Sequence, residues 1–312
     1  MKFLFLMDPL EAVVFEKDTT FMLMVGAHEK GHEVYYLPKD GISLIEGKAH
    51  FHVTKVKPQR IAHEPFIEEH TLRLSQNDIH AVFIRPDPPF DEQYLMNTWI
   101  LDHLPKTIPV INDPTGVRTV NEKVWAAQFT AFTPATIISA NKRELLDFIA
   151  KHKDIIAKPA NAFGGQSVFH IESGHTNTKV ILETLSKGYG QPIILQKYIP
   201  ESKNGDKRIL LLNGEILGAL LRVHSEGDHR NNFYAGGKPA AATINARDKQ
   251  IVEILKPHLQ KLGLYFVGID ILGDYLIEVN VTSPTCLQEM NKLYNQNLEV
   301  KVIEFVEKLC RV

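Results

Sequence analysis

Two carboxylates and one amide lie close together between Phe266 and Thr285, in segments that are otherwise apolar. Glu278 and Asn280 are two residues apart, so on a strand their side chains point to the same face. Asp270 lies on the segment that would pair with them in a hairpin. Oxygen-only ligands suit Mg²⁺ that is held together with nucleotide phosphates. We therefore interpret these three residues as a candidate metal site; the alternative is the solvated face of an edge hairpin.

The turn of this hairpin decides whether such a site can form. Direct pairing of Asp270 with Glu278 needs a three-residue loop over 273–275, because the midpoint of the two carboxylates falls inside it. A regular two-residue loop would instead pair Asp270 with Ile277 and turn the carboxylates to opposite faces. The spacing therefore predicts a three-residue loop or a bulge close to it.

Lysines and glycines supply the complementary charge. Lys123 stands at an expected helix start and Lys158 at an expected strand end, and a glycine-containing segment at 161–167 follows it. Its Gly164 and Gly165 allow backbone N–H groups to approach phosphate oxygens closely. Each feature alone has an ordinary explanation, because lysines are usually solvated and paired glycines usually form a turn. Together they describe a phosphate clamp.

Arginines form a third group, which begins with the sequence GDKR at 205–208. Arginine suits forked contacts to phosphate and carboxylate groups. The candidates are Arg208, Arg222 and Arg230, with Asn232 close to the last of them. The alternative for Arg230 is a solvated loop residue.

The elements that position these groups change in kind along the chain. Short apolar strands at 3–7, 33–37, 79–84 and 108–111 are separated by helical segments, and Asp18 is placed to cap a helix over 19–30. This alternation predicts an open, largely parallel α/β sheet. The rest of the chain has an α+β pattern, with predicted helices at 121–129, after Asn141 and at 247–261, strands at 155–158, 168–171, 193–199, 208–212 and 216–222, a hairpin over 265–281 and a terminal helix.

We place domain boundaries near residues 122 and 200. They give an N-terminal α/β substrate-binding domain at 1–122, a central lid at 123–200 and a C-terminal catalytic domain at 201–312. The polar stretch at 224–238 has little periodicity and is expected to be a mobile loop that closes over the site.

Composition excludes several classes of function. The 35 basic and 37 acidic side chains give a net charge of −2, which offers no reason to expect nucleic acid or an anionic membrane as a partner. The two cysteines provide neither a disulfide framework nor a CxxC metal pattern, which suits a cytoplasmic protein.

Two short motifs match well-known signatures by chance. His28 and His32 have the H-E-x-x-H spacing of zinc peptidases, but Gly31 between them predicts that the helix stops before the second histidine. The segment GISLIEGKA at 41–49 resembles a P-loop, yet it has one residue too many between its glycines and an alanine where Mg²⁺ needs a hydroxyl. We interpret it as a hairpin that turns at Glu46 and Gly47.

Longer segments carry a resemblance to a known family. The chain resembles the prokaryotic glutathione synthetases, which are ATP-grasp enzymes, over almost its whole length. The matching segments are MDP at 7–9, KDTTF at 17–21, RPDPPFD at 85–91, NEK at 121–123, KP at 158–159, QKYIP at 196–200, GDKR at 205–208, AGG at 235–237 and FVGIDILGD…EVNVTSPTC at 266–286.

This resemblance implies an ATP-grasp fold behind an N-terminal open parallel-sheet domain, and a role for each candidate. Lys123, Lys158 and the glycine loop would hold the phosphates of ATP, residues 196–199 the adenine and Asp206 the ribose. The residues implied around the adenine are Gln196, Lys197, Tyr198 and Ile199, and the implied ligands of Mg²⁺ (or Mn²⁺) are Asp270, Glu278 and Asn280. The residues that would meet the transferring phosphate or the peptide carboxylate are Arg208, Arg222, Arg230 and Asn232. Those that would hold the peptide are Arg85, Ser283 and Thr285.

The implied reaction joins γ-glutamylcysteine to glycine at the expense of ATP, through an acyl phosphate, and the family suggests a homo-oligomer. This sequence departs from the family pattern at Asn161 and Ala162, which replace Asp-Gly, at Asn231, which replaces Gly, and at Pro86. An ATP-grasp ligase with another peptide donor or amine acceptor, a nucleotide-binding regulator without catalysis and a zinc peptidase are the alternatives.

Overall fold

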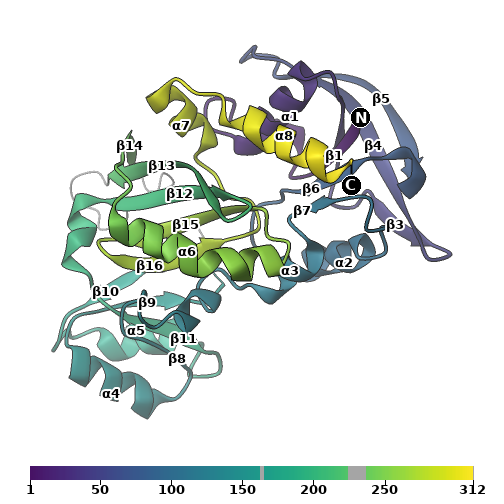
Figure 1. Cartoon of the computed structure of the whole chain (residues 1–312). Helices are drawn as coiled ribbons and strands as arrows, with labels where there is room; N and C mark the ends of the chain where they lie inside the picture. Colours follow the sequence, from purple (N-terminus) through teal and green to yellow (C-terminus); the bar gives the residue numbers. More distant parts are fainter. Residues whose placement is uncertain (162–164, 224–236, 312) are drawn as a thin grey trace.

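Three β-sheets follow one another along the chain (Figure 1). The computed structural model describes residues 1–161, 165–223 and 237–311. The first sheet has seven strands, the second four and the third five. No helix within the described residues is both long and apolar enough to cross a membrane.

The first sheet is parallel in its centre and antiparallel at one side. Its parallel part is β2-β1-β6-β7, as the alternating pattern predicted, and β1 is buried along nearly its whole length. An antiparallel extension through β4 also belongs to this sheet. Its hairpin with β3 was predicted, whereas its pairing with β2 and β5 was not. The bounds are β1 (Lys2–Leu6), β2 (Glu33–Leu37), β3 (Ile42–Ile45), β4 (Lys48–Pro58), β5 (Phe66–Ser75), β6 (Ala81–Ile84) and β7 (Val110–Ile111), with α1 (Thr19–Glu29), α2 (Glu92–Leu101) and α3 (Pro114–Thr119).

Local signals in this region act as predicted. The Asp18 carboxylate accepts a 2.7 Å hydrogen bond from the Phe21 N–H and begins α1. The helix ends at Glu29, and Gly31 follows with φ +82°, so His32 lies outside it and contacts Glu307 at 2.7 Å. The P-loop-like segment is the β3–β4 hairpin, whose turn residues 46 and 47 both have positive φ.

The second sheet is small, antiparallel and ordered β10-β9-β11-β8. Its own core of leucine and isoleucine side chains lies beneath two helices. Asn141 caps the first helix by accepting from the N–H groups of Arg143 and Glu144. The bounds are β8 (Thr136–Ser139), β9 (Ile155–Pro159), β10 (Phe169–Ile171), β11 (Ile193–Lys197), α4 (Lys142–His152) and α5 (Thr178–Leu185).

The predicted helix at 121–129 is wrong in length. A short 3₁₀ helix covers only Trp125–Gln128. The Asn121 side chain accepts from the N–H groups of Lys123 and Val124, which forms a tight turn in place of a regular helix start.

The third sheet is antiparallel, with the order β14-β13-β12-β15-β16. Alternate residues of its central strand pack on opposite sides: Ile209 and Leu211 against α6, and Leu210 against α7 and α8. The last helix, α8, also packs against α1 and so belongs to the core of the first sheet (Figure 1). The bounds are β12 (Asp206–Leu212), β13 (Glu215–Val223), β14 (Lys238–Ala241), β15 (Phe266–Leu272), β16 (Tyr275–Asn280), α6 (Ala246–Lys261), α7 (Leu287–Tyr294) and α8 (Leu298–Leu309).

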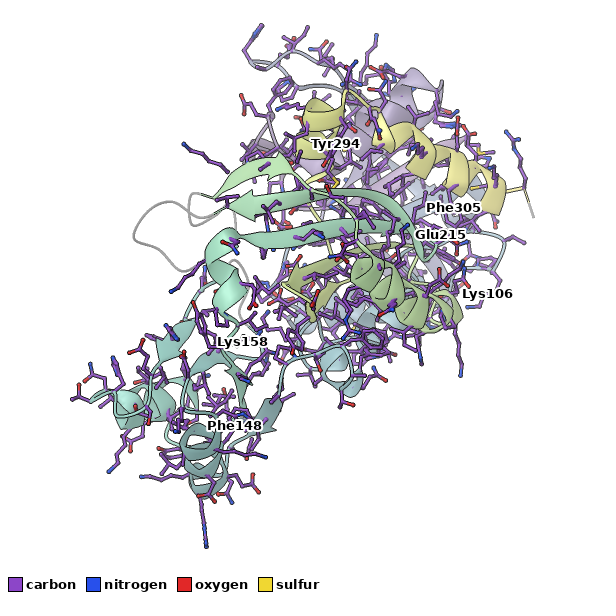
Figure 2. All side chains as sticks on the ribbon, turned by 60° about the vertical axis from the view of Figure 1, so that its left-hand side comes forward. Lys106, Phe148, Lys158, Glu215, Tyr294 and Phe305 are labelled. Carbon is purple, nitrogen blue, oxygen red and sulfur yellow. The ribbon has the colours of Figure 1, made fainter. Side chains whose placement is uncertain are left out.

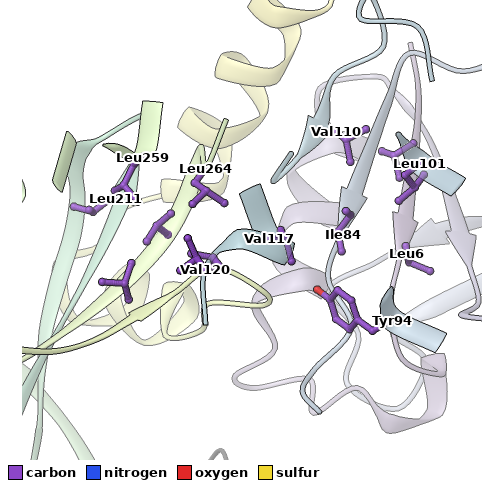
Figure 3. Packing of buried hydrophobic residues seen from close by; sticks show 14 of the residues in the cluster. Leu6, Ile84, Tyr94, Leu101, Val110, Val117, Val120, Leu211, Leu259 and Leu264 are labelled. Atoms are coloured by element: carbon purple, nitrogen blue, oxygen red, sulfur yellow. The ribbon is translucent and has the colours of Figure 1, made fainter. Parts of the chain in front are cut away.

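Apolar packing joins the first and third sheets. Figure 3 shows Val117 and Val120 between Ile84 of the first sheet and Leu264 beside the third. At Gly116 the approach is so close that an added Cβ would lie 2.2 Å from the Leu262 carbonyl oxygen. The two larger sheets therefore form one packed body.

Both ends of the segment that carries the small sheet meet the turn between β15 and β16. At the entering end, the Leu276 N–H donates to the Phe132 carbonyl at 2.7 Å. At the leaving end, a Cβ built on Gly273 would lie 3.3 Å from the Cβ of Glu201. Arg247 bridges the carbonyls of Ala131 and the turn residue Asp274.

One buried amide fastens the β15–β16 hairpin to the first sheet. The Asn112 side chain donates to the carbonyls of Phe266 and Val281 at 2.8 Å, and it accepts from the Phe266 N–H at 2.7 Å. Asn112 follows β7 directly and is 3% exposed. It therefore links the hairpin that carries the candidate metal ligands to the N-terminal strands.

Asn112→Ala is expected to destabilise the fold by about 3 kcal/mol, because three buried backbone groups lose their partners. Thermal unfolding measures this as a lower Tm than that of the wild type. Asn77→Ala, at an exposed position, is the matched control and should leave the Tm unchanged. Equal Tm values for the two variants would contradict the fastening role.

Candidate functional site

An open cavity lies between the small sheet and the β15–β16 hairpin. Figure 2 shows Lys158 where the small sheet faces the five-stranded sheet. The cavity holds about 1570 Å³ of empty space, including its open mouth. The predicted site residues that line it are Lys123, Lys158, Gly165, Gln196, Lys197, Tyr198, Ile199, Asp206, Arg208, Arg222, Asp270, Glu278, Asn280, Ser283 and Thr285.

Two lysines approach this cavity from different elements. Lys158, on β9, is buried and donates to the Gln196 side-chain oxygen at 3.3 Å. Burial lowers the pKa of the Lys158 ammonium to about 8; Glu278 opposes this effect and the charge of Lys123 adds to it. Lys123 lies 3.5 Å from a Glu278 oxygen. The two ammonium groups can neutralise phosphate charge in a partly dehydrated place.

One part of the cavity lining, here called the slot, is apolar and comes from both the small sheet and the hairpin. Side chains of Ile156, Val168 and Ile199 line it from one side and Leu272 and Ile277 from the other. A planar aromatic group fits between apolar walls of this kind.

Tyr198, at the end of this slot, is held from two directions. Its ring stacks on His170 with centroids 4.1 Å apart, and His170 contacts Asp154 at 2.5 Å. Its hydroxyl accepts from Ser202 at 3.2 Å. These contacts hold the Tyr198 side chain at the cavity wall.

Two buried arginines surround Asp270. Arg208 makes a forked contact to this carboxylate, and Arg222 contacts both Asp270, at 2.8 Å, and Asp206. Burial alone would raise the pKa of Asp270, but the two guanidinium groups hold it below its usual value. Asp270 is therefore ionised in the folded protein, and the arginines are held in fixed positions.

The hairpin has the register that the site requires. Asp270 pairs directly with Glu278, so their side chains share one face. The turn itself contains two residues, Gly273 and Asp274, and a bulge at Ile277 restores the register. The sequence predicted either a three-residue loop or a bulge close to it, and the bulge is confirmed.

The chemistry of these donors fits a hard divalent cation. The Asn280 nitrogen donates to the Gly268 carbonyl at 3.3 Å, which leaves the amide oxygen available for a ligand. Glu278 has only a long contact to Lys123 among its ion pairs within the described residues. No group of three His, Cys, Asp or Glu side chains that could hold a metal occurs in those residues. A cation here therefore needs further oxygens, which nucleotide phosphates supply.

The remaining predicted residues divide into three sets: one lines the cavity, one lies behind it, and the others lie outside the described residues. Ser283 donates to the Asp87 carboxylate at 2.5 Å and lines the cavity with it. Arg85 is not among the residues that line the cavity; it is 4% exposed and donates to Thr20 and to the Pro284 carbonyl, so it supports the segment at 283–285 from behind. Gly164, Arg230 and Asn232, and with them the predicted mobile loop, lie outside the described residues.

Sequence reasoning assigned no role to Glu122 or Asp87, although both line the cavity. Their signal was present in two matching motifs, since Glu122 precedes Lys123 in NEK and Asp87 lies in RPDPPFD. Cys286 is 1% exposed, and burial raises the pKa of its thiol.

Comparison with known proteins gives two family matches that together span most of the chain. Residues 1–118 match the N-terminal domain of prokaryotic glutathione synthetase, and residues 122–295 match its ATP-grasp domain. The glutathione synthetase of Pseudomonas aeruginosa is 36% identical over 96% of this chain and 95% of its own length. That of Synechocystis is 37% identical, with 99% of each chain covered.

Solved structures give the same fold at low sequence identity. The D-cycloserine synthetase DcsG superposes with a TM-score of 0.68 at 13% identity, covering 98% of this chain and 99% of its own. The ATP-grasp ligase PsnB, complexed with its minimal precursor, superposes with a TM-score of 0.66 at 17% identity, covering 98% and 99%. These likenesses confirm the predicted ATP-grasp architecture.

Proposed function

We propose, from the premise that this chain belongs to the prokaryotic glutathione synthetase family of ATP-grasp ligases, that its cavity joins γ-glutamylcysteine to glycine. The observation that carries the proposal is one cavity lined by two lysines, the apolar slot residues and three side chains with oxygen donors. The products are glutathione, ADP and phosphate.

The nucleotide lies, in this proposal, along the side of the small sheet. Lys123 and Lys158 hold the phosphates, Gly165 brings backbone N–H groups near them, and the slot residues Gln196 to Ile199 enclose the adenine. Asp206 meets the ribose. Lys158 on β9 and Gln196 on β11 belong to the same small sheet, so one sheet contributes both to the phosphate site and to the adenine site.

Mg²⁺, or Mn²⁺, would be held by Asp270, Glu278 and Asn280 together with the phosphates. When bound, the cation neutralises charge on the phosphates of ATP. The residues around it keep Asp270 ionised and hold Asp270 and Glu278 on one face of the hairpin.

The peptide carboxylate lies between the arginines and the segment at 283–285. Its oxygen attacks the γ-phosphorus of ATP and ADP leaves, which gives an acyl phosphate. The amine of glycine then attacks the carbonyl carbon, loses a proton, and phosphate leaves. Arg208 and Arg222, already fixed by Asp270 and Asp206, stabilise the developing charge without rearrangement. Ser283 and Thr285 orient the peptide, and Arg230 and Asn232 remain part of the proposal on sequence grounds.

A coupled ADP-release assay tests the proposal. ADP and glutathione should form in equal amounts when ATP, Mg²⁺, γ-glutamylcysteine and glycine are all present, and omission of any one should stop the reaction. Equal turnover with a different donor or acceptor would favour another ATP-grasp ligase. ATP binding without ADP release across a panel of donors and amines would favour a nucleotide-binding regulator.

The pH dependence of ATP affinity provides an independent test of Lys158. Above about pH 8 this ammonium loses its proton in the free protein. Phosphate binding favours the protonated form, so the Kd for ATP should rise by up to about tenfold per pH unit above that value. Isothermal titration between pH 6.5 and 9.5 measures the trend.

The matched variant is Lys158→Arg, which keeps its charge throughout this range. Its Kd should stay nearly constant with pH. A flat profile for the wild type, or the same slope in both proteins, would remove Lys158 from the phosphate site.

We also propose three functional domains, at 1–122, 123–200 and 201–312. The protein is proposed to be a cytoplasmic homo-oligomer that has no nucleic-acid or membrane partner. The near-neutral charge and the two free thiols support the location and the absence of such partners. Light scattering of the purified chain measures the subunit number.

A further inference from the structure

The dipeptide Glu122-Lys123 contacts strand β16 and its continuation at three successive points. The Val279 N–H donates to the Glu122 carbonyl at 2.9 Å. The Thr282 hydroxyl donates to the Glu122 carboxylate at 2.8 Å. Lys123 lies 3.5 Å from Glu278. The contacts on this segment therefore start at Glu278, a proposed metal ligand, and end at Thr282, beyond the proposed ligand Asn280.

The position of β16 in its sheet explains why such contacts matter. It is the last strand in the order β14-β13-β12-β15-β16, so β15 pairs with it along one edge only. The strand ends at Asn280, and Thr282 lies past the last residue of the ladder. Strand ends fray unless another group holds them.

We propose that Glu122 is a positioning residue for the metal-binding strand. Its main-chain carbonyl and its carboxylate hold the free edge and the end of β16, so that the side-chain oxygens of Glu278 and Asn280 face the phosphates together. This inference rests on the proposed function, because it assigns Glu122 to the cation site described above.

A structural role alone would give a different result. If Glu122 merely joined two parts of the fold, its replacement would lower the Tm and leave cation affinity unchanged. A positioning role changes cation affinity at temperatures far below unfolding. The hydrogen bond between Thr282 and Glu122 makes the two roles distinguishable, because a substitution at either residue removes it.

The test is a Mn²⁺ titration of the full chain, followed by electron paramagnetic resonance, in the presence of a non-hydrolysable ATP analogue. Glu122→Ala and Thr282→Val each remove the hydrogen bond and should raise the Kd for Mn²⁺ about tenfold. Glu122→Gln and Thr282→Ser keep an acceptor and a donor and should stay within twofold of the wild type. The double variant Glu122→Ala with Thr282→Val should bind no more weakly than the weaker single variant.

A parallel assay varies Mg²⁺. The concentration for half-maximal turnover should rise about tenfold in Glu122→Ala and Thr282→Val, with kcat at saturating Mg²⁺ within twofold of the wild type. Wild-type Mn²⁺ affinity in Thr282→Val, or purely additive losses in the double variant, would overturn the inference. If Glu122→Ala does not fold, the comparison of Thr282→Val with Thr282→Ser decides the question.

The same titration separates this inference from the proposed function. Failure of the wild type to bind Mn²⁺ with the nucleotide would remove the cation site itself. Binding by the wild type and equally by Thr282→Val would keep that site and remove only the role of Glu122.

Discussion

Replacement of Glu278 by glutamine is expected to lower ligase turnover by at least about a hundredfold while the chain stays folded. The change preserves shape but removes one of the two carboxylates on the shared face of the hairpin. Without the Glu278 carboxylate the site would bind the cation more weakly, and less of the negative charge on the phosphoryl group would be neutralised. The fold survives because Glu278 is partly exposed and has no contact with the buried arginines among its ion pairs in the described residues.

Steady-state ADP release at saturating ATP and Mg²⁺ measures this effect. Glu253→Gln, on the exposed side of α6, makes the same chemical change away from the cavity and should retain full turnover. Circular dichroism should give the same Tm for both variants. Turnover of Glu278→Gln within fivefold of the wild type would remove Glu278 from the metal site.

Asp270→Asn should abolish activity and also destabilise the fold by about 3 kcal/mol. Asp270 is the shared partner of two buried arginines, so asparagine leaves Arg208 without its opposing carboxylate and Arg222 with that of Asp206 alone. Breaking a buried ion pair from one side is costly because the remaining charge stays in a poorly solvated place. Two of the three proposed metal ligands are thus expected to differ: Glu278 is needed for catalysis alone, and Asp270 for stability as well.

Thermal unfolding of the two variants side by side checks this contrast. Asp270→Asn should lower the Tm by roughly 5–10 °C, and Glu278→Gln should leave it within about 2 °C. Equal Tm values would show that the arginines do not depend on Asp270, and the cluster would then have no structural role.

Spacing along one strand predicted much of the hairpin, because side-chain direction alternates strictly in a β-strand. Glu278 and Asn280 had to share a face, and the requirement that Asp270 join them predicted an irregularity that the structure has at Ile277. Which irregularity occurs depends on how the turn packs against Phe132 and Arg247, and these contacts are distant in sequence.

Other features depend on tertiary contacts that leave no local pattern. Residues 121–124 have ordinary helix-forming neighbours, but the Asn121 side chain and the contacts of Glu122 to β16 form a turn there. Arg85 could be recognised in its motif, but no local signal shows that its guanidinium is buried beneath Pro284. Strand β4 does have the alternating pattern of a half-buried strand, whereas β5 is exposed along most of its length and has no such pattern.

The meeting of both junctions of the small sheet at one turn has a consequence for protein engineering. Its chain enters beside Leu276 and leaves beside Gly273, so both junctions lie on one turn. In topological terms the segment at 133–200 is an insertion whose two ends nearly coincide. Exchange of this segment with that of another ATP-grasp ligase is expected to transplant the small-sheet wall of the slot as a cassette, while the wall formed by Leu272 and Ile277 stays in place.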